Sequence, residues 1–233
     1  RRPNSDQGFN DSEDFRGIWR VWRSLSRLTV VQIYHVFKPT QLHGDHSGGA
    51  GVTNVAIKRW FNSRHDPERP FFLFINYLDA HFPYHAPDPY GRKFVEPAHQ
   101  QLATELLTTK AQDVADWTPP PIKWDDKKWG ALTDLYDGEI FYLDAMLTEL
   151  FDDLRARNLW DDTLVVVTAD HGEHLGEHGL FLHRFSVYEP TLHIPMIMRL
   201  PGRLPAGKRF DDWVGLPDVF PPVLRLLCAP PPA

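Results

Sequence analysis

The stretch that decides the fold, residues 163–195, reads TLVVVTADHGEHLGEHGLFLHRFSVYEPTLHIP. It opens with a continuous apolar run, Leu164–Val167, and such a run is typical of a strand buried on both faces of a sheet. The run ends at Asp170 and His171, and Gly172 lets the backbone turn sharply there. Ligands of open α/β sheets bind just beyond the carboxyl ends of the strands. We therefore expect this carboxylate and this imidazole, both good ligands for a divalent cation, to lie at a binding site.

A second apolar run, Phe71–Asn76, predicts another buried strand. It is followed by Asp79 and His81, and Pro83 fixes the turn after them. Two strands that both end in polar motifs predict one shared site at one edge of the sheet. Taken alone, His81 would read as an ordinary loop histidine, and Asp170 with His171 as a helix cap beside a solvated side chain.

Apolar residues at helical spacing predict two helices, over residues 52–62 and from about 129 to 157. We interpret most acidic residues of the longer helix as a solvated face. A helix followed by a strand predicts an α/β fold with a mostly parallel central sheet flanked by helices. Residues 85–128 are Pro-rich without a sustained period, which predicts a surface excursion near the mouth of the site. Residues 1–45 are predicted to form an irregular segment, and residues 46–233 one domain.

Composition narrows the class of protein. The chain has 233 residues, enough for one sizeable core, and its net charge is −6 with scattered basic residues, which argues against a nucleic-acid partner. A single Cys excludes an internal disulfide, and no apolar run approaches the ~20 residues of a membrane helix. The chain begins Arg-Arg-Pro without Met, so we expect a piece of a longer protein, whose compartment and oligomeric state the sequence leaves open.

Four motifs in a fixed order carry a resemblance to a known family. They are NYLDAHFPY at residues 76–84, LYDGEI at 135–140, DHGE with LGEHG and YEPTLHIPMI from 170 onward, and DVFPPVLRLL at 218–227. Together they resemble the sulfatase family of the alkaline phosphatase superfamily. The resemblance implies an alkaline-phosphatase-like fold, incomplete at its N-terminus, and metal-dependent hydrolysis of small-molecule or glycan sulfate esters. It also suggests a periplasmic, extracellular or membrane-attached protein.

The resemblance assigns roles to five residues. Asp170 and His171 match metal ligands of the family, with Ca²⁺ the expected ion. Because many sulfatases have Asn in place of His171, Mn²⁺ or Zn²⁺ stays open. His81 resembles the histidine that hydrogen-bonds the sulfate group and helps to protonate the leaving oxygen. His183 or Arg184 stands where the family often has a sulfate-contacting Lys, and this departure leaves open which of the two acts.

Half of the family's site is missing from the sequence. No C-x-P-x-R segment, whose Cys becomes the formylglycine nucleophile, occurs, and neither does the early Asp-Asp pair. Cys228 is no substitute, because Pro232 stands at the Arg position after it. We therefore expect the nucleophile upstream and predict that this piece alone is inactive. Two alternatives remain: a phosphate or phosphonate ester hydrolase or phospho-headgroup transferase of the same superfamily, and an inactive binding remnant.

One motif is a decoy. His174, Glu177 and His178 literally match the H-x-x-E-H pattern of zinc peptidases. That chemistry needs both histidines on one face of a regular helix, and Gly176 lies between them. We therefore reject the peptidase interpretation.

Overall fold

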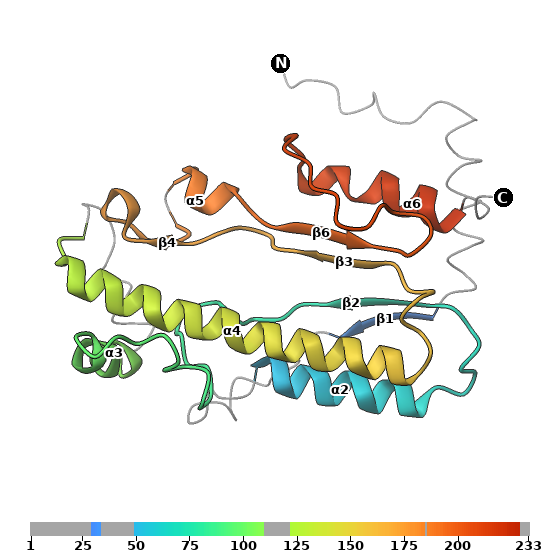
Figure 1. Ribbon diagram of the computed structural model, residues 1–233, viewed down its shortest axis with the longest axis horizontal. Helices are drawn as coiled ribbons and strands as arrows, with labels where there is room; N and C mark the ends of the chain where they lie inside the picture. The colour runs from blue at the N-terminus through green and yellow to red at the C-terminus, as the bar shows by residue number, and fades with distance from the viewer. Residues whose placement is uncertain (1–28, 34–48, 110–121, 185, 229–233) are drawn as a thin grey trace, which may run out of the picture.

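The computed structural model describes residues 29–33, 49–109, 122–184 and 186–228. Helices and strands alternate along the chain, which agrees with the predicted α/β class (Figure 1). In order, the elements are β1 (Thr29–Ile33), α2 (Gly49–Ser63), β2 (Phe71–Ile75), α3 (Gln100–Leu107), α4 (Asp126–Ala156), β3 (Val165–Thr168), β4 (His174–Leu175), the 3₁₀ turn η1 (Glu177–Gly179), β5 (Phe181–Leu182), α5 (Glu189–Leu192), β6 (Met196–Arg199), η2 (Leu216–Asp218) and α6 (Phe220–Cys228).

The described strands form three two-stranded sheets. Strands β1 and β2 pair in parallel, whereas β3 pairs with β6 and β4 with β5 in antiparallel fashion. The prediction of a mostly parallel sheet is therefore not met by the described pairs. For β4 and β5 the reason is the short connection between them. A parallel pair needs a crossover of a dozen or more residues, whereas β4 and β5 are joined by a short turn that can only reverse the chain.

Helices lie on both sides of the strands. In Figure 1, β1, β2, β3 and β6 run between the helices α2 and α4 on one side and α6 on the other. The backbone N–H of Gly51 donates to the Tyr142 hydroxyl at 3.0 Å, and the Asn54 side chain donates to the Met146 carbonyl at 2.8 Å, so polar contacts join α2 to α4. These helices were predicted from periodicity, and both are confirmed with slightly longer bounds.

Strand β2 is buried on one face only. Phe71 and its alternate neighbours pack against a core of α2 and α4 residues that includes Ile57 and Leu150. Phe72 and Phe74 point the other way and are 42% and 49% exposed. The expectation of burial on both faces is wrong for β2 in the described part of the chain, because α2 and α4 cover only the first face.

The main core cluster ties the site segments to α4. Leu132 and Leu135 of α4 are almost fully buried beside Phe82, Tyr84 and Phe181. The rings of Phe82 and Phe181 meet edge to face, with centroids 5.2 Å apart. Phe82 follows His81 directly, and Phe181 precedes His183 by two residues. The same apolar contact therefore brings the loop after β2 next to β5.

Two predicted segments hold more regular structure than expected. The Pro-rich excursion contains α3, whose Ala103 and Leu106 are buried against the core that includes α4 residues. Its residues 110–121 lie outside the described part, as does the side chain of Cys228. The segment 1–45, expected to be irregular, contributes β1, whose TVVQI sequence is rich in β-branched residues.

Within the described residues, no helix has the length and apolarity that crossing a bilayer requires.

Candidate active site

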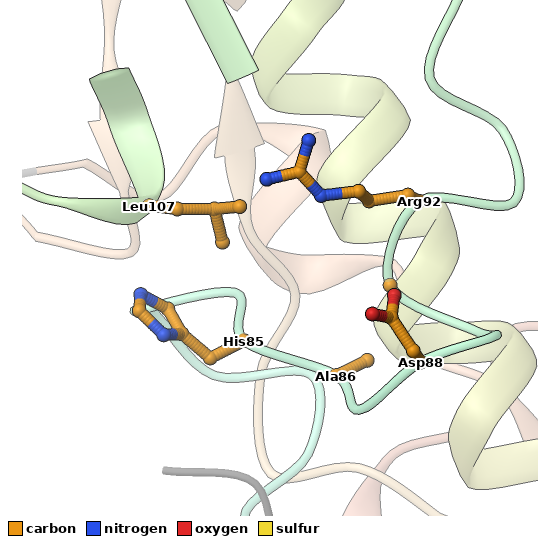
Figure 2. A pocket seen from close by; sticks show the side chains of 6 residues that line it. His85, Ala86, Asp88, Arg92 and Leu107 are labelled. Atoms are coloured by element: carbon orange, nitrogen blue, oxygen red, sulfur yellow. The ribbon is translucent and has the colours of Figure 1, made fainter. Parts of the chain in front are cut away.

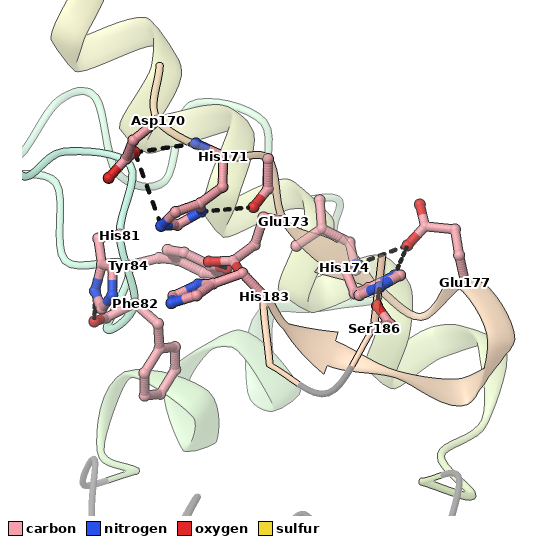
Figure 3. Close-up of polar contacts among 12 residues, drawn as sticks. His81, Phe82, Tyr84, Asp170, His171, Glu173, His174, Glu177, His183 and Ser186 are labelled. Atoms are coloured by element: carbon pink, nitrogen blue, oxygen red, sulfur yellow. Dashed lines mark hydrogen bonds and ion pairs between the residues drawn. The ribbon is translucent and has the colours of Figure 1, made fainter. Parts of the chain in front are cut away.

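Three histidines from three separate segments lie side by side. The rings of His171 and His183 are stacked, with centroids 3.9 Å apart, and the ring of His81 lies 5.4 Å from that of His183. His81 follows β2, His171 follows β3, and His183 follows β5 (Figure 3). His183 is therefore the middle ring of a row. We call His81, Asp170, His171 and His183 the histidine cluster.

Hydrogen bonds fix the protonated nitrogen of the two outer rings. Nδ1 of His81 lies 2.6 Å from the Phe82 carbonyl, and Nδ1 of His171 lies 2.9 Å from the Gly172 carbonyl. A carbonyl only accepts, so each Nδ1 must carry the proton. In a neutral ring, Nε2 then keeps its lone pair. Both outer rings thus offer Nε2 to a bound group.

Asp170 stands at the open side of the cluster. Its side chain is 87% exposed, and Oδ1 accepts the backbone N–H of His171 at 3.1 Å. The same oxygen lies 3.8 Å from Nε2 of His171. Two ligands of one cation can have this separation, so the donor set fits part of a metal site. Among the described residues, no three His, Cys, Asp or Glu side chains form a group that could hold an ion by themselves.

The structure adds a buried carboxylate that the sequence analysis left without a role. The Glu173 side chain is only 6% exposed, and its Oε1 lies 3.0 Å from Nδ1 of His183. Its other oxygen accepts a long hydrogen bond of 3.4 Å from the buried Tyr84 hydroxyl. Burial raises the pKa of Glu173 to about 7, although His81 and His171 oppose that shift. Its place directly after the DHG motif was the only sequence signal.

Burial and nearby positive charge both act on the protonation of His183. Burial lowers its pKa, and the nearby His171 and Arg184 lower it further. The neutral ring is therefore favoured at neutral pH, which is a hydrogen-bonding form rather than a fixed cation. Arg184 is exposed and acts on His183 through its charge. The structure thus gathers four of the five predicted residues in one cluster, with Arg184 at its margin.

The peptidase decoy has no helix to support it. His174 lies in β4, Glu177 begins η1, and His178 has a positive φ of 60°. His174 is fully buried and its Nε2 lies 2.6 Å from the Ser186 hydroxyl oxygen, so it serves a packed loop. The two histidines therefore do not share the helix face that a zinc peptidase requires.

A shallow pocket lies away from the cluster, on the Pro-rich excursion. His85, Asp88 and Arg92 face into it from the loop that follows the Tyr84 segment, and Leu107 closes it from α3 (Figure 2). Its lining carries one guanidinium and one carboxylate. None of its lining residues belongs to the histidine cluster.

The comparisons with known proteins decide the family. The family model described as Sulfatase matches residues 5–228 of this chain, nearly its whole length. The chain belongs to the sulfatase family. Within this family of the alkaline phosphatase superfamily, the chain is 40% identical over 89 residues to Arylsulfatase K from Canis lupus familiaris, a match that covers 38% of this chain and 16% of the relative. A Sulfatase from Formosa agariphila is 25% identical over 183 residues, covering 75% and 35% of the two chains.

The solved structures agree with the fold. The structure of yidJ from Bacteroides fragilis, a protein assigned as a sulfatase, aligns with a TM-score of 0.57 and 23% identity, covering 77% of this chain and 37% of that chain. The sulfatase chain described here thus matches only 16% to 37% of the length of these relatives. The family match also begins earlier than the four motifs, the first of which starts at residue 76.

Proposed function

We propose that the protein carrying this chain hydrolyses sulfate esters with the help of a divalent cation. The histidine cluster is the observation that carries the proposal: three imidazoles and one exposed carboxylate converge from three strand ends in a chain of the sulfatase family. The preceding part of the protein would supply the formylglycine nucleophile and the remaining metal ligands. Membership of the sulfatase family makes a small-molecule or glycan sulfate ester the expected substrate class.

Asp170 and His171 would hold the cation, Ca²⁺ first and Mn²⁺ or Zn²⁺ as alternatives. When bound, such an ion polarises an ester oxygen and favours the deprotonated form of the nucleophile. Nε2 of His171 and the exposed Asp170 carboxylate are both available for this task. The chain alone, without a nucleophile, is expected to be inactive.

His81 is placed to act on the leaving oxygen. The Nδ1 proton of His81 is held by the Phe82 carbonyl, so Nε2 is the atom open to the ester, and it donates a proton to the leaving oxygen when the ring is an imidazolium. Protonated at both nitrogens, a form that the ester's negative charge favours, His183 would donate a hydrogen bond from Nε2 to an ester oxygen, and Arg184 would add positive charge at the margin of the site. Charge that builds on the sulfate oxygens during bond breaking is thereby stabilised.

The second candidate is the same site acting on phosphate or phosphonate esters, including headgroup transfer. This candidate is retained because residue 183 is His, where many sulfatases have Lys. The identity of the upstream nucleophile separates the two: Cys in C-x-P-x-R supports sulfate chemistry, and Ser or Thr elsewhere supports phospho-chemistry. A protein with neither nucleophile nor Asp pair would be a binding remnant.

The test uses the whole protein expressed with its upstream part. Turnover of an aryl sulfate, an aryl phosphate and a phosphonate monoester is measured after chelation and after addition of Ca²⁺, Mn²⁺ or Zn²⁺. Mass spectrometry reports whether the upstream Cys has become formylglycine. We expect metal-dependent turnover that is fastest with the sulfate. Faster turnover of the phosphate or phosphonate supports the second candidate, and turnover unaffected by chelation contradicts the metal role.

A further inference from the structure

The starting observation is a glutamate that no assigned role explains. Glu173 lies in the segment after β3 that also carries Asp170 and His171, yet its side chain is almost fully buried. Burying a carboxylate is costly unless hydrogen bonds or charges offset the loss of water. Here its two oxygens meet one ring nitrogen of His183 and the hydroxyl of Tyr84 (Figure 3). The carboxylate therefore connects the core to the middle ring of the histidine cluster.

From this geometry we propose that Glu173 is a positioning residue for His183. The inference rests on the proposed ester hydrolysis for its functional consequence. The Glu173 carboxylate accepts a hydrogen bond from the Nδ1–H of His183, so the proton stays on Nδ1 and the ring is held with Nε2 toward the ester. Without this acceptor, the neutral ring can adopt either of two tautomers in either of two flipped orientations. Only one of these four arrangements both points Nε2 toward the ester and keeps the proton on Nδ1.

The support for Glu173 comes from rigid parts of the fold. Tyr84 is 2% exposed and packs with Phe82 and Leu135 in the main core cluster. Its ring meets that of Tyr136 edge to face at 5.3 Å, so α4 also fixes its place. A residue whose own position is set by packing can hold its partner within the narrow range that catalysis needs. The contact between Tyr84 and Glu173 thereby transmits the rigidity of α4 to His183.

The matched control lies four residues away. Glu177 is a second glutamate of the same loop, but its side chain is 49% exposed and accepts from the backbone N–H of Leu175. It contacts no member of the histidine cluster in the described part of the chain. Replacing Glu177 with Gln therefore changes the same functional group without touching the proposed positioning contact.

The experiment uses the whole protein labelled with ¹⁵N-histidine, with wild type, Glu173→Leu, Glu173→Gln and Glu177→Gln compared. Long-range ¹H–¹⁵N spectra report which ring nitrogen of His183 carries the proton, and the spectrum of His183→Asn assigns the signal. Kinetics on an aryl sulfate report kcat and KM. We expect Glu173→Leu to lose the Nδ1-protonated form and to lower kcat about tenfold to hundredfold with little change in KM.

Glu173→Gln is the conservative variant. Its amide oxygen can still accept from Nδ1, so we expect the tautomer to persist and kcat to be largely retained. A merely structural role would lower the folded fraction without this tautomer-specific pattern. If Glu173→Leu does not fold, Glu173→Asp, which withdraws the carboxylate by one methylene, replaces it with the same expectation. An unchanged His183 spectrum in the folded Leu or Asp variant overturns the proposal.

The spectra separate this inference from the proposed function. If the wild type turns over no sulfate, phosphate or phosphonate ester, the proposed function fails, whereas the tautomer of His183 still tests the positioning contact. If the wild type is active and Glu173→Leu matches Glu177→Gln in both spectrum and kcat, the positioning role fails and the proposed function stands.

Discussion

Two buried glutamates flank the same loop, and their surroundings differ. Glu139 of α4 is 4% exposed and accepts hydrogen bonds from the backbone of His85 and Ala86, while Glu173 contacts Tyr84 one residue earlier. Burial raises the pKa of both, to about 8 for Glu139 and about 7 for Glu173. Asp79 raises the pKa of Glu139 further, whereas histidines lower that of Glu173.

Neighbouring charge thus separates the pKa values of two carboxyls whose side chains are both largely buried. At Glu139, a second carboxylate disfavours ionisation, and the side chain works as a neutral anchor for the loop backbone. At Glu173, imidazoles favour ionisation, and the side chain can hold a ring in one orientation. Burial alone would have assigned both to the same structural role. We therefore expect changes near Glu173 to affect turnover and changes near Glu139 to affect stability.

The largest expected effect contrasts two histidines. His81→Gln removes the proposed proton donor of the cluster and should lower kcat about 10²- to 10⁴-fold, with the melting temperature little changed. His99→Gln, at the start of α3, breaks the 2.7 Å contact with Asp134 of α4 and should instead destabilise the fold by about 1–3 kcal/mol. Steady-state kinetics and urea unfolding of the whole protein measure both. Equal losses of kcat in the two variants would contradict the division between the regions.

The next effect concerns the cation. Asp170→Asn should weaken metal binding about hundredfold or more, because a direct ligand matters at least as much as a supporting one. Asp161→Asn is the control, since the two side chains are similarly exposed, at 87% and 84%, and Asp161 forms an ion pair with Arg199, away from the histidine cluster in sequence. Calorimetric titration with Ca²⁺, after a chelator has removed bound metal, gives the Ca²⁺ affinity of each variant. If the two variants bind Ca²⁺ equally well, Asp170 is not a ligand.

Much of this arrangement was predictable from sequence, and the limits have physical causes. The helices over 49–63 and 126–156 each follow from an apolar stripe, and the strand ends at Ile75 and Thr168, which precede His81 and Asp170, follow from the position of apolar runs. Strand pairing did not follow, because the direction of β6 relative to β3 depends on how 27 intervening residues, 169–195, return the chain. The composition of an apolar run does not indicate with which other strand it pairs.

The buried glutamates show the same limit for side chains. The acidic residues of α4 were interpreted mostly as a solvated face, yet Glu139 is buried. Gly138 beside it lets the backbone of Gly91 approach so closely that a Cβ would lie 2.8 Å from the Gly91 carbonyl oxygen. Glu139 lies four residues after Leu135 and three before Tyr142, so helical spacing places it on the buried face of α4. Its charge, rather than its position in the helix, is what favoured the solvated interpretation.

A smaller effect tests Glu139 through pH. The folded pKa of about 8 lies above the ordinary value of 4.5, so the folded state binds the proton more tightly. Stability from this group is therefore complete below about pH 4.5 and is lost as pH rises through about 8, with a slope of up to about 1.4 kcal/mol per pH unit. Glu139→Gln keeps an acceptor for the loop backbone and should flatten this decline. Unfolding free energies at pH 5, 7 and 9 measure it, and an unchanged slope would refute the assignment.

The smallest expected effect tests the link between core and cluster. Tyr84→Phe removes only the hydroxyl whose hydrogen bond to Glu173 is long, at 3.4 Å, and leaves the ring in the core. Its loss should cost about 0.5–1.5 kcal/mol of stability. The decrease in kcat should stay well below that of Glu173→Leu, because the contact between Glu173 and His183 persists. Denaturant unfolding and kinetics on the same preparation measure both. A kcat loss as large as that of Glu173→Leu would show that Tyr84, rather than the carboxylate it supports, sets the orientation of the histidine.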